Sequence, residues 1–370
     1  MKIAIVMPLA EQRGGAELML LHLLRANKAG PNVDYQVVFL EAGTMVAAVQ
    51  ALGYPVSVFP AGQLRQVGRF AATVYALKNW MQHLNIQIAM SWMSKAHLYA
   101  GPAAFAAGIP SVWWQHGVSG GHWLDRWATA TPAQMIFCCS KTAEQAQKQL
   151  LPRRKTSVIY PAVDLSRLAP DVLPSVTQAR QEIGLPAGRP VIGIVSRLQH
   201  SKGVHVFLEA AAQVARSHPD AQFVVVGGTH ALEPDYADAL TAQVGRLNIG
   251  GSVLFAGYQE NSLLWMQAMD IVVLASIAPE GFGMVIIEAQ GLGKTVIATR
   301  SGGPSEVVED GVDGFLTTPN DASGLAEALL KALPALHQPG PASAARRKAA
   351  SFGTERLAED MARNLQRLTV

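Results

Sequence analysis

The sequence has little cysteine and lacks long apolar runs. Its 370 residues include two cysteines, Cys138 and Cys139, which are adjacent in a strand-like segment. Adjacent cysteines in a strand suit neither a disulfide scaffold nor a zinc site. No apolar run reaches the roughly 20 residues of a membrane-spanning helix, and the apolar start from Met1 to Pro8 is too short for a signal-peptide core. We therefore expect the protein to remain in the cytoplasm.

Two nucleotide-binding fingerprints are also missing. No Gly-x-Gly-x-x-Gly occurs, so the common dinucleotide-binding pattern is absent. The tripeptide from Gly293 to Thr295 is similar to the end of a P-loop, but the glycine required five positions earlier is Glu288. Thr295 is also predicted to begin a strand. We therefore do not expect these residues to form a P-loop.

Charge is distributed unevenly along the chain. Up to Ser157 there are 14 Lys and Arg against 6 Asp and Glu, whereas the remainder has 16 against 21. The basic excess either solvates one domain or attracts it to an anionic membrane leaflet or an acidic acceptor. Within this part, Arg65 and Arg69 alternate with apolar residues, so this segment either settles on a membrane surface or packs Leu64 and Phe70 inward. No nucleic-acid partner is expected.

Short apolar runs alternate with longer helical patterns, which is typical of parallel sheets built from βαβ units. At this length two domains are expected, and residues 161–190, with five prolines, indicate a linker with one short helix. The sequence thus predicts an α/β fold with two doubly wound, Rossmann-like domains, at 1–165 and 166–351. A Pro- and Ala-rich stretch over 334–345 precedes a predicted last helix within 352–370. The expected strands are 3–7, 35–40, 56–59, 88–91, 112–115, 135–139 and 158–159, followed by 191–195, 223–226, 253–256, 271–274, 296–298 and 315–317.

Two glutamates, Glu280 and Glu288, lie between the predicted strands 271–274 and 296–298. One follows a strand on a loop and the other lies a turn inside a helix, at the sheet edge where α/β folds bind ligands. With Gly281 and Gly283 between them, backbone amides can approach a phosphate or a sugar closely. The alternative is a solvated face of an amphipathic helix, which the apolar residues between the glutamates disfavour.

Other polar or flexible residues follow predicted strands in the same way. Arg197 comes directly after the strand 191–195 and Lys202 precedes the next helix, so both are expected at the ligand-binding edge, although such a pair is often only surface charge. The pair Gly14 and Gly15 leaves the first strand, where a plain turn also favours glycine and a dinucleotide site stays open. His116 ends a strand after two tryptophans, where a packed or capping histidine is the ordinary interpretation.

In order and spacing, these motifs resemble those of the retaining glycosyltransferases of family four. Glu280 and Glu288 are similar to the two glutamates of that family's signature, and residues 302–306 with 311–315 match the stretch downstream. The resemblance extends from Met1 to about Leu316. It implies the GT-B architecture, in which two Rossmann-like domains face a cleft. It also implies that the terminal helix, residues 352–370, packs back on the first domain.

The resemblance assigns a role to each motif. Glu288 is expected to bind the ribose hydroxyls, Glu280 to hold hydroxyls of the donor sugar, and His116 to contact the transferred sugar. Arg197 and Lys202 are expected to stabilise the leaving diphosphate. The implied catalytic residues are thus Glu280, His116, Arg197 and Lys202, and the implied donor-binding residues are Gly14, Gly15, Arg197, Lys202, Gly281, Phe282, Gly283, Met284 and Glu288.

The implied activity is transfer of a hexose-like sugar from a nucleoside diphosphate to a glycan or lipid-linked acceptor, in cell-surface polysaccharide or glycolipid synthesis. Retention is attributed in this family to attack on the leaving-group face, and no second carboxylate motif here suggests a covalent nucleophile. No Asp-x-Asp occurs, so we expect no metal and no cofactor. The alternatives are a nucleotide-sugar epimerase or hydrolase of the same fold, and a non-catalytic nucleotide-sugar-binding protein. The sequence does not identify the base, the sugar or the acceptor.

Overall fold

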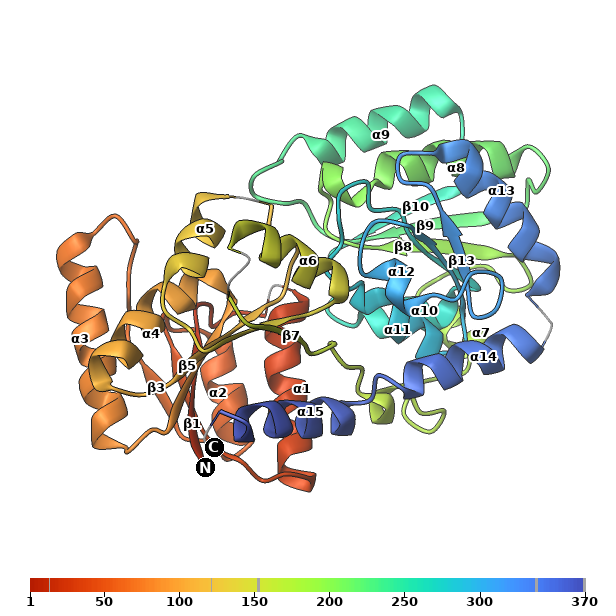
Figure 1. Ribbon diagram of the computed structural model, residues 1–370. Helices are drawn as coiled ribbons and strands as arrows, with labels where there is room; N and C mark the ends of the chain where they lie inside the picture. The colour runs from red at the N-terminus through yellow and green to blue at the C-terminus, as the bar shows by residue number, and fades with distance from the viewer. Residues whose placement is uncertain (13, 121, 152–153, 337–338, 369–370) are drawn as a thin grey trace. The chain divides into compact units, whose positions relative to one another are not determined.

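The structure, a computed structural model, describes residues 1–370 except 13, 121, 152–153, 337–338 and 369–370. The chain forms two compact units, an amino unit of residues 1–162 with 354–370 and a carboxyl unit of residues 163–353 (Figure 1). Each unit is built around one parallel sheet with helices on its faces. The predicted α/β class with two doubly wound sheets is confirmed.

The amino unit has a seven-stranded parallel sheet in the order β3-β2-β1-β4-β5-β6-β7. β1 lies between β2 and β4, and Ile3 is in register with Tyr35 on one side and Ile88 on the other. The strand order reverses at β1, which is where doubly wound sheets bind ligands. The strands are β1 Lys2–Met7, β2 Asp34–Phe39, β3 Val56–Val58, β4 Ile88–Trp92, β5 Ser111–Gln115, β6 Met135–Cys138 and β7 Thr156–Val158.

Helices cover this sheet, so its central strands are apolar on both faces. α3 and α4 pack on the face that includes Ala4, Val6 and Val38. The last helix, α15, packs beside α1, and Arg356 donates to the carbonyl oxygens of Tyr160 and Pro161. The chain therefore returns to the amino unit at its end (Figure 1). The helices of this unit are α1 Gly15–Ala29, α2 Thr44–Ala51, α3 Val67–His83, α4 Met93–Ala107, α5 Trp123–Ala130, α6 Lys141–Leu150 and α15 Thr354–Gln366.

The basic segment of the amino unit packs its apolar side chains inward. Leu64 and Phe70 lie against the core beneath α3 and α4, and the ring of Phe70 is 4.8 Å from that of Tyr99. Val67, the first residue of α3, stays exposed, as do both arginines. Of the two sequence interpretations, the structure supports inward packing. Among the residues that the structure describes, no helix is both long and apolar enough to cross a membrane.

The carboxyl unit begins with the linker, which contains the short helices η1 Leu165–Leu168 and α7 Val176–Glu182. Its six-stranded sheet has the order β10-β9-β8-β11-β12-β13, so β8 lies between β9 and β11 and marks the switch point. The strands are β8 Val191–Val195, β9 Gln222–Val226, β10 Val253–Gly257, β11 Ile271–Leu274, β12 Thr295–Thr299 and β13 Phe315–Thr317.

Alternate residues of these strands face two helical layers. Ile192, Phe223 and Val273 point into the core under α8, α9 and α13. α10, α11 and α14 pack on the opposite face (Figure 1). The remaining elements are η2 His200–Lys202, α8 Val204–Ala215, α9 Tyr236–Leu247, α10 Ser262–Ala268, α11 Met284–Gly291, α12 Pro304–Val307, α13 Ala322–Ala332, η3 Leu333–Ala335 and α14 Pro339–Ala350.

Candidate active site

In the carboxyl unit, the predicted charged residues come from the two strands at the switch point. Arg197 leaves β8, Lys202 ends the short helix η2 that follows, and Glu280 lies on the loop that leaves β11. Because parallel strands end at the same edge, all three lie at the carboxyl edge of this sheet. This edge is the position at which their sequence pattern predicted a ligand site.

Lys202 and Glu280 are in direct contact. The Lys202 Nζ lies 2.7 Å from the Glu280 Oε2, and the Ser276 hydroxyl donates to the same oxygen at 2.8 Å. The approach depends on Gly203, whose φ is +68° and where a Cβ atom would lie 2.0 Å from the Ala275 carbonyl oxygen. Any larger residue would push the η2 turn away from the end of β11, and with it the lysine.

The backbone around Glu280 is tied to the glycine-rich stretch that follows β12. The Glu280 amide donates to the Ser301 carbonyl at 2.6 Å, and the Gly303 amide donates to the Glu280 carbonyl at 2.9 Å. A Cβ atom on Gly303 would lie 2.5 Å from the Phe282 Cα. The downstream motif therefore has a structural role, because its glycines let this stretch pair closely with the loop that carries Glu280.

The glycines after Glu280 shape the start of α11. Gly283 has φ of +90° and precedes Met284, the first residue of the helix, and this end has no side-chain cap. The side chain of Phe282 is 4% exposed and packs against Phe352 at a ring distance of 5.4 Å. Only the backbone of Phe282 is thus placed to serve a ligand. The resemblance named Phe282 among the donor-binding residues, and this role stays a prediction.

Glu288 lies one turn further along α11 and is half-buried. Burial raises the pKa of its carboxyl to about 7, and the positive charge of Arg167 acts in the opposite direction. Burial thus favours the protonated form of this carboxyl. Such a group both donates to and accepts from hydroxyl groups.

Arg197 differs from Lys202 in its contacts. Its side chain is exposed and makes no hydrogen bond or ion pair within the part of the chain that the structure describes. The lysine is held by the carboxylate, whereas the guanidinium stays available for an incoming anion.

In the amino unit, the glycine pair lies where the loop after β1 enters α1. Gly14 is extended, precedes Gly15, the first residue of α1, and provides no side-chain cap for this helix. Arg13 of the same loop lies outside the described residues. A helix start without a cap presents backbone amides at the carboxyl edge of the sheet, which is a favourable position for an anion.

His116 follows β5 at the same edge of the amino unit's sheet. Its ring stacks on Trp92 at 5.0 Å and is tilted against Trp114 at 4.4 Å. Its Nε2 is buried without a hydrogen-bond partner among the described residues. Burial lowers the pKa of the imidazole to about 3, so the ring is neutral at physiological pH. A buried polar nitrogen without a partner costs free energy unless a ligand supplies one.

Trp92 connects the two features of the amino unit, and the sequence reasoning did not identify it. This residue ends β4, stacks on His116 and donates its indole N–H to the Ala16 carbonyl at 2.8 Å, in the first turn of α1. Met93, which follows it, has φ of +66°, a strained value for a residue with a side chain. The available signal was its place at the end of the apolar run 88–91.

The predicted residues therefore fall into one group in each unit. Lys202 and Glu280 are in contact, and Arg197, Glu288 and the residues 281–284 lie on adjoining loops or on α11 in the carboxyl unit. Gly14, Gly15 and His116 lie at the sheet edge of the amino unit.

Comparison with protein families agrees with this division. Residues 13–167 match the profile of Glycosyltransferase Family 4, and residues 175–346 match that of Glycosyl transferases group 1. The chain belongs to the group 1 glycosyltransferases. The two matches cover the amino and carboxyl units of this glycosyltransferase in turn, and every predicted site residue lies inside one of them.

Curated relatives match about half of this group 1 glycosyltransferase. The D-inositol 3-phosphate glycosyltransferase of Corynebacterium urealyticum is 34% identical over 181 residues, which are 48% of this chain and 42% of the relative. That of Nocardia farcinica is 33% identical over 198 residues, 51% of this chain and 43% of the relative. The matched part is therefore less than half of the length of these relatives.

Solved structures match over the whole chain. Anabaena Alr3699/HepE in complex with UDP and glucose is 29% identical, with a TM-score of 0.87 and 99% of each chain covered. The same protein is also known in complex with UDP-glucose. Sucrose-phosphate synthase from Thermosynechococcus elongatus, at 20% identity, has a TM-score of 0.81 and covers 99% of this chain. The likeness to these structures confirms the GT-B class of fold.

Proposed function

We propose that this protein transfers a hexose-like sugar from a nucleoside diphosphate to a glycan or lipid-linked acceptor, with retention of the anomeric configuration. The observation that carries the proposal is the contact between Lys202 and Glu280, 2.7 Å apart, with the exposed Arg197 at the same sheet edge. In this proposal the Glu280 carboxylate accepts from sugar hydroxyls, and Lys202, which contacts it, faces the diphosphate together with Arg197. UDP is the proposed nucleotide, because Alr3699/HepE is solved with UDP and with UDP-glucose.

In this mechanism the two cations, Arg197 and Lys202, contribute most to lowering the activation barrier. Negative charge grows on the diphosphate as the glycosidic bond breaks, and fixed donors that meet this charge lower the barrier most. Lys202 is held in place by Glu280, Arg197 follows β8 directly, and the amides of residues 281–284 at the start of α11 add partial positive charge. Because these residues provide the compensating charge, we propose that the reaction needs no metal ion and no cofactor.

His116 orients the sugar in this proposal and does not act as a base. With a pKa of about 3, its imidazole is too weak to remove a proton from an acceptor hydroxyl efficiently. The unpaired Nε2 instead offers one hydrogen bond to a sugar hydroxyl. The departing phosphate then takes the acceptor's proton, and attack occurs on the face that it leaves.

We further propose that the protein works in the cytoplasm, at the inner face of a membrane. Leu64 and Phe70 pack inward, so the contact rests on charge attraction through residues such as Arg65, without insertion of apolar groups. Vesicles with anionic lipid should therefore retain the protein at low salt and release it fully at high salt. Equal sedimentation with neutral and anionic vesicles would favour a soluble acceptor.

The decisive test is incubation of the purified protein with UDP-glucose and a panel of glycan and lipid-linked acceptors. Transferred sugar with retained configuration supports the proposal. Free glucose alone indicates a hydrolase, and an altered nucleotide sugar indicates an epimerase. Binding of UDP without any product indicates a non-catalytic binding protein. A thermal-shift comparison of UDP, GDP and ADP should show the largest stabilisation with UDP.

A further inference from the structure

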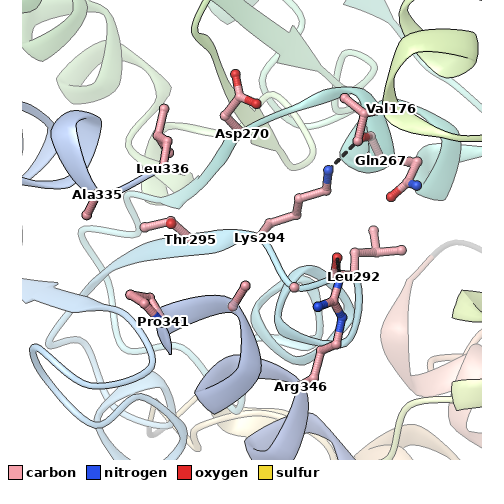
Figure 2. Close-up of a pocket in the computed structure, with 12 residues that line it drawn as sticks. Val176, Gln267, Asp270, Leu292, Lys294, Thr295, Ala335, Leu336, Pro341 and Arg346 are labelled. Carbon is pink, nitrogen blue, oxygen red and sulfur yellow. Dashed lines mark hydrogen bonds between the residues drawn. The ribbon is translucent and has the colours of Figure 1, made fainter. Parts of the chain in front are cut away.

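A polar cavity lies at the opposite end of the carboxyl unit's sheet from Glu280. It has a volume of about 260 Å³. Asp270, directly before β11, and Lys294, directly before β12, place it at the amino ends of these strands. The candidate donor site lies at their carboxyl ends. The wall is completed by Val176, Gln267, Leu292, Gly293, Thr295, Ala335, Leu336, Pro341, Ala342 and Arg346 (Figure 2).

Lys294 extends its side chain into this cavity and is 8% exposed. Its Nζ donates to the Gln267 carbonyl oxygen at 2.6 Å (Figure 2). An ammonium group has three donors, and this contact uses one. Among the residues that the structure describes, the lysine forms no ion pair.

The carboxylate in the wall does not neutralise this lysine, because it already has other partners. Asp270 Oδ2 accepts from Arg180 at 2.7 Å and from the Val191 amide at 2.8 Å. Arg180 also donates to the carbonyl oxygens of Ala268 and Arg189. This aspartate and this arginine therefore balance each other, and the charge of Lys294 remains.

Arg346, an exposed residue, adds a second cation, and it forms no ion pair with a carboxylate of the described residues. It extends from α14, and its guanidinium lies over Gly293, where a Cβ atom would be 2.5 Å from the Arg346 Cζ. Its one hydrogen bond to a described residue is to the Leu292 carbonyl oxygen at 3.2 Å. A guanidinium has five N–H donors, so most of them remain available.

The cavity thus carries two positive charges that the surrounding residues leave uncompensated. Burial lowers the pKa of Lys294 to about 8, Asp270 opposes this shift, and Arg180 and Arg346 add to it. The lowered pKa reflects the free-energy cost of keeping Lys294 charged at a buried position. An anion that pairs with both cations would offset this cost. At 260 Å³ the cavity is smaller than the roughly 300–1,000 Å³ of pockets that hold drug-sized ligands, so it suits a ligand smaller than a nucleotide sugar.

We propose that this cavity binds a small phosphate-class anion between the Lys294 ammonium and the Arg346 guanidinium. A planar guanidinium fork beside a point-charge ammonium is the donor set that suits phosphate oxygens. The ligand is either free inorganic phosphate or the phosphate group of a small phosphomonoester. The P-loop interpretation of residues 293–295 remains excluded, because Thr295 begins β12. The lysine acts here at the amino end of a strand, without a cradle of backbone amides.

The test is isothermal titration and thermal shift of the full chain with inorganic phosphate, with sodium chloride at equal ionic strength as the reference. Wild type should show one saturable site and a raised Tm. Lys294→Met and Arg346→Ala should each weaken this binding at least tenfold. Matched controls are Lys331→Met, at an exposed position of α13, and Arg347→Ala, the exposed neighbour of Arg346 on α14. Both controls should bind phosphate as wild type does.

A separate variant distinguishes this cavity from the proposed donor site, where a phosphate would meet Arg197. Arg197→Ala should keep the phosphate site, and Lys294→Met should bind UDP as wild type does. Sulfate, which keeps its charge over this range, should bind more weakly as pH rises through about 8, because Lys294 then loses its proton. The same titration with glycerol phosphate compares a phosphomonoester with inorganic phosphate. The ligand that binds more tightly identifies the class that the cavity prefers. Unchanged phosphate binding in both Lys294→Met and Arg346→Ala would overturn the proposal, as would loss of binding in Arg197→Ala alone.

Discussion

Replacement of Glu280 by glutamine should separate sugar transfer from nucleotide binding. The substitution removes a negative charge 2.7 Å from the Lys202 Nζ and leaves the shape of the side chain nearly unchanged. At an effective dielectric constant of about 20, the two charges attract by about 6 kcal/mol before desolvation. Both side chains are about one fifth exposed, at 23% and 19%, so water offsets much of this energy. A net coupling of about 1–2 kcal/mol remains.

The substitution should strengthen UDP binding and weaken sugar transfer. Lys202 becomes free to face a diphosphate, and a carboxylate that repels the diphosphate is lost. UDP should therefore bind roughly 5- to 30-fold more tightly to Glu280→Gln than to wild type. Transfer should fall by about 100- to 1000-fold, because the amide no longer provides two carboxylate acceptors for sugar hydroxyls.

Isothermal titration with UDP and a single-turnover transfer assay measure the two effects. Glu327→Gln, an exposed glutamate on α13, is the matched control and should change neither. The difference in UDP affinity should shrink at high salt, as expected for a charge effect. A tenfold loss of UDP affinity in Glu280→Gln would refute the reasoning and assign this carboxylate to the nucleotide. Unchanged transfer would remove it from the site.

Three further outcomes are expected. Arg197→Ala and Lys202→Met should each reduce kcat by the equivalent of about 2–4 kcal/mol of transition-state stabilisation. EDTA should leave the activity of wild type unaffected. Loss of activity in EDTA and its rescue by magnesium would contradict the proposal that the reaction needs no metal ion. Glu288 has a pKa of about 7 in the folded protein against an ordinary value of 4.5, so the folded state binds more protons and the free energy of unfolding falls as pH rises between these values. Denaturant titrations of Glu288→Gln should show a flatter dependence of the free energy of unfolding on pH. A pH dependence equal to that of wild type would refute this expectation. His116→Asn should lower kcat and leave the pH–rate profile unmoved between about pH 5 and 8, because the imidazole is already neutral. Loss of the acidic limb, which is the fall in rate as a base becomes protonated, would instead identify His116 as a base.

The alternation of short apolar runs with helical patterns was sufficient to predict both sheets. Each expected strand overlaps an observed one, because a parallel strand covered on both faces must be apolar along its length. The predicted strand ends also placed Arg197 and Glu280 at the carboxyl edge of one sheet and His116 at that of the other. In such sheets, ligand-binding residues follow the carboxyl ends of strands. Local pattern and chain order decide these features, so one sequence reveals them.

Contacts between distant segments needed the tertiary structure. Trp92 reaches His116 and the first turn of α1 only because β4 lies between β1 and β5 in the sheet. The sequence pattern also did not predict helix α14, which lies in the Pro- and Ala-rich stretch. Pro341 is tolerated in the first turn of this helix, where its missing amide is not required.

The sequence by itself determined the two parallel sheets, the family and the residues at the strand ends. The tertiary structure decided which charges meet. Lys202 contacts Glu280 because Gly203 lets the η2 turn approach the end of β11. Lys294 stays without a carboxylate because Arg180, 90 positions from Asp270 in the chain, already pairs with that aspartate. Such pairings depend on the packing of residues that are distant in sequence, and no local pattern contains that information.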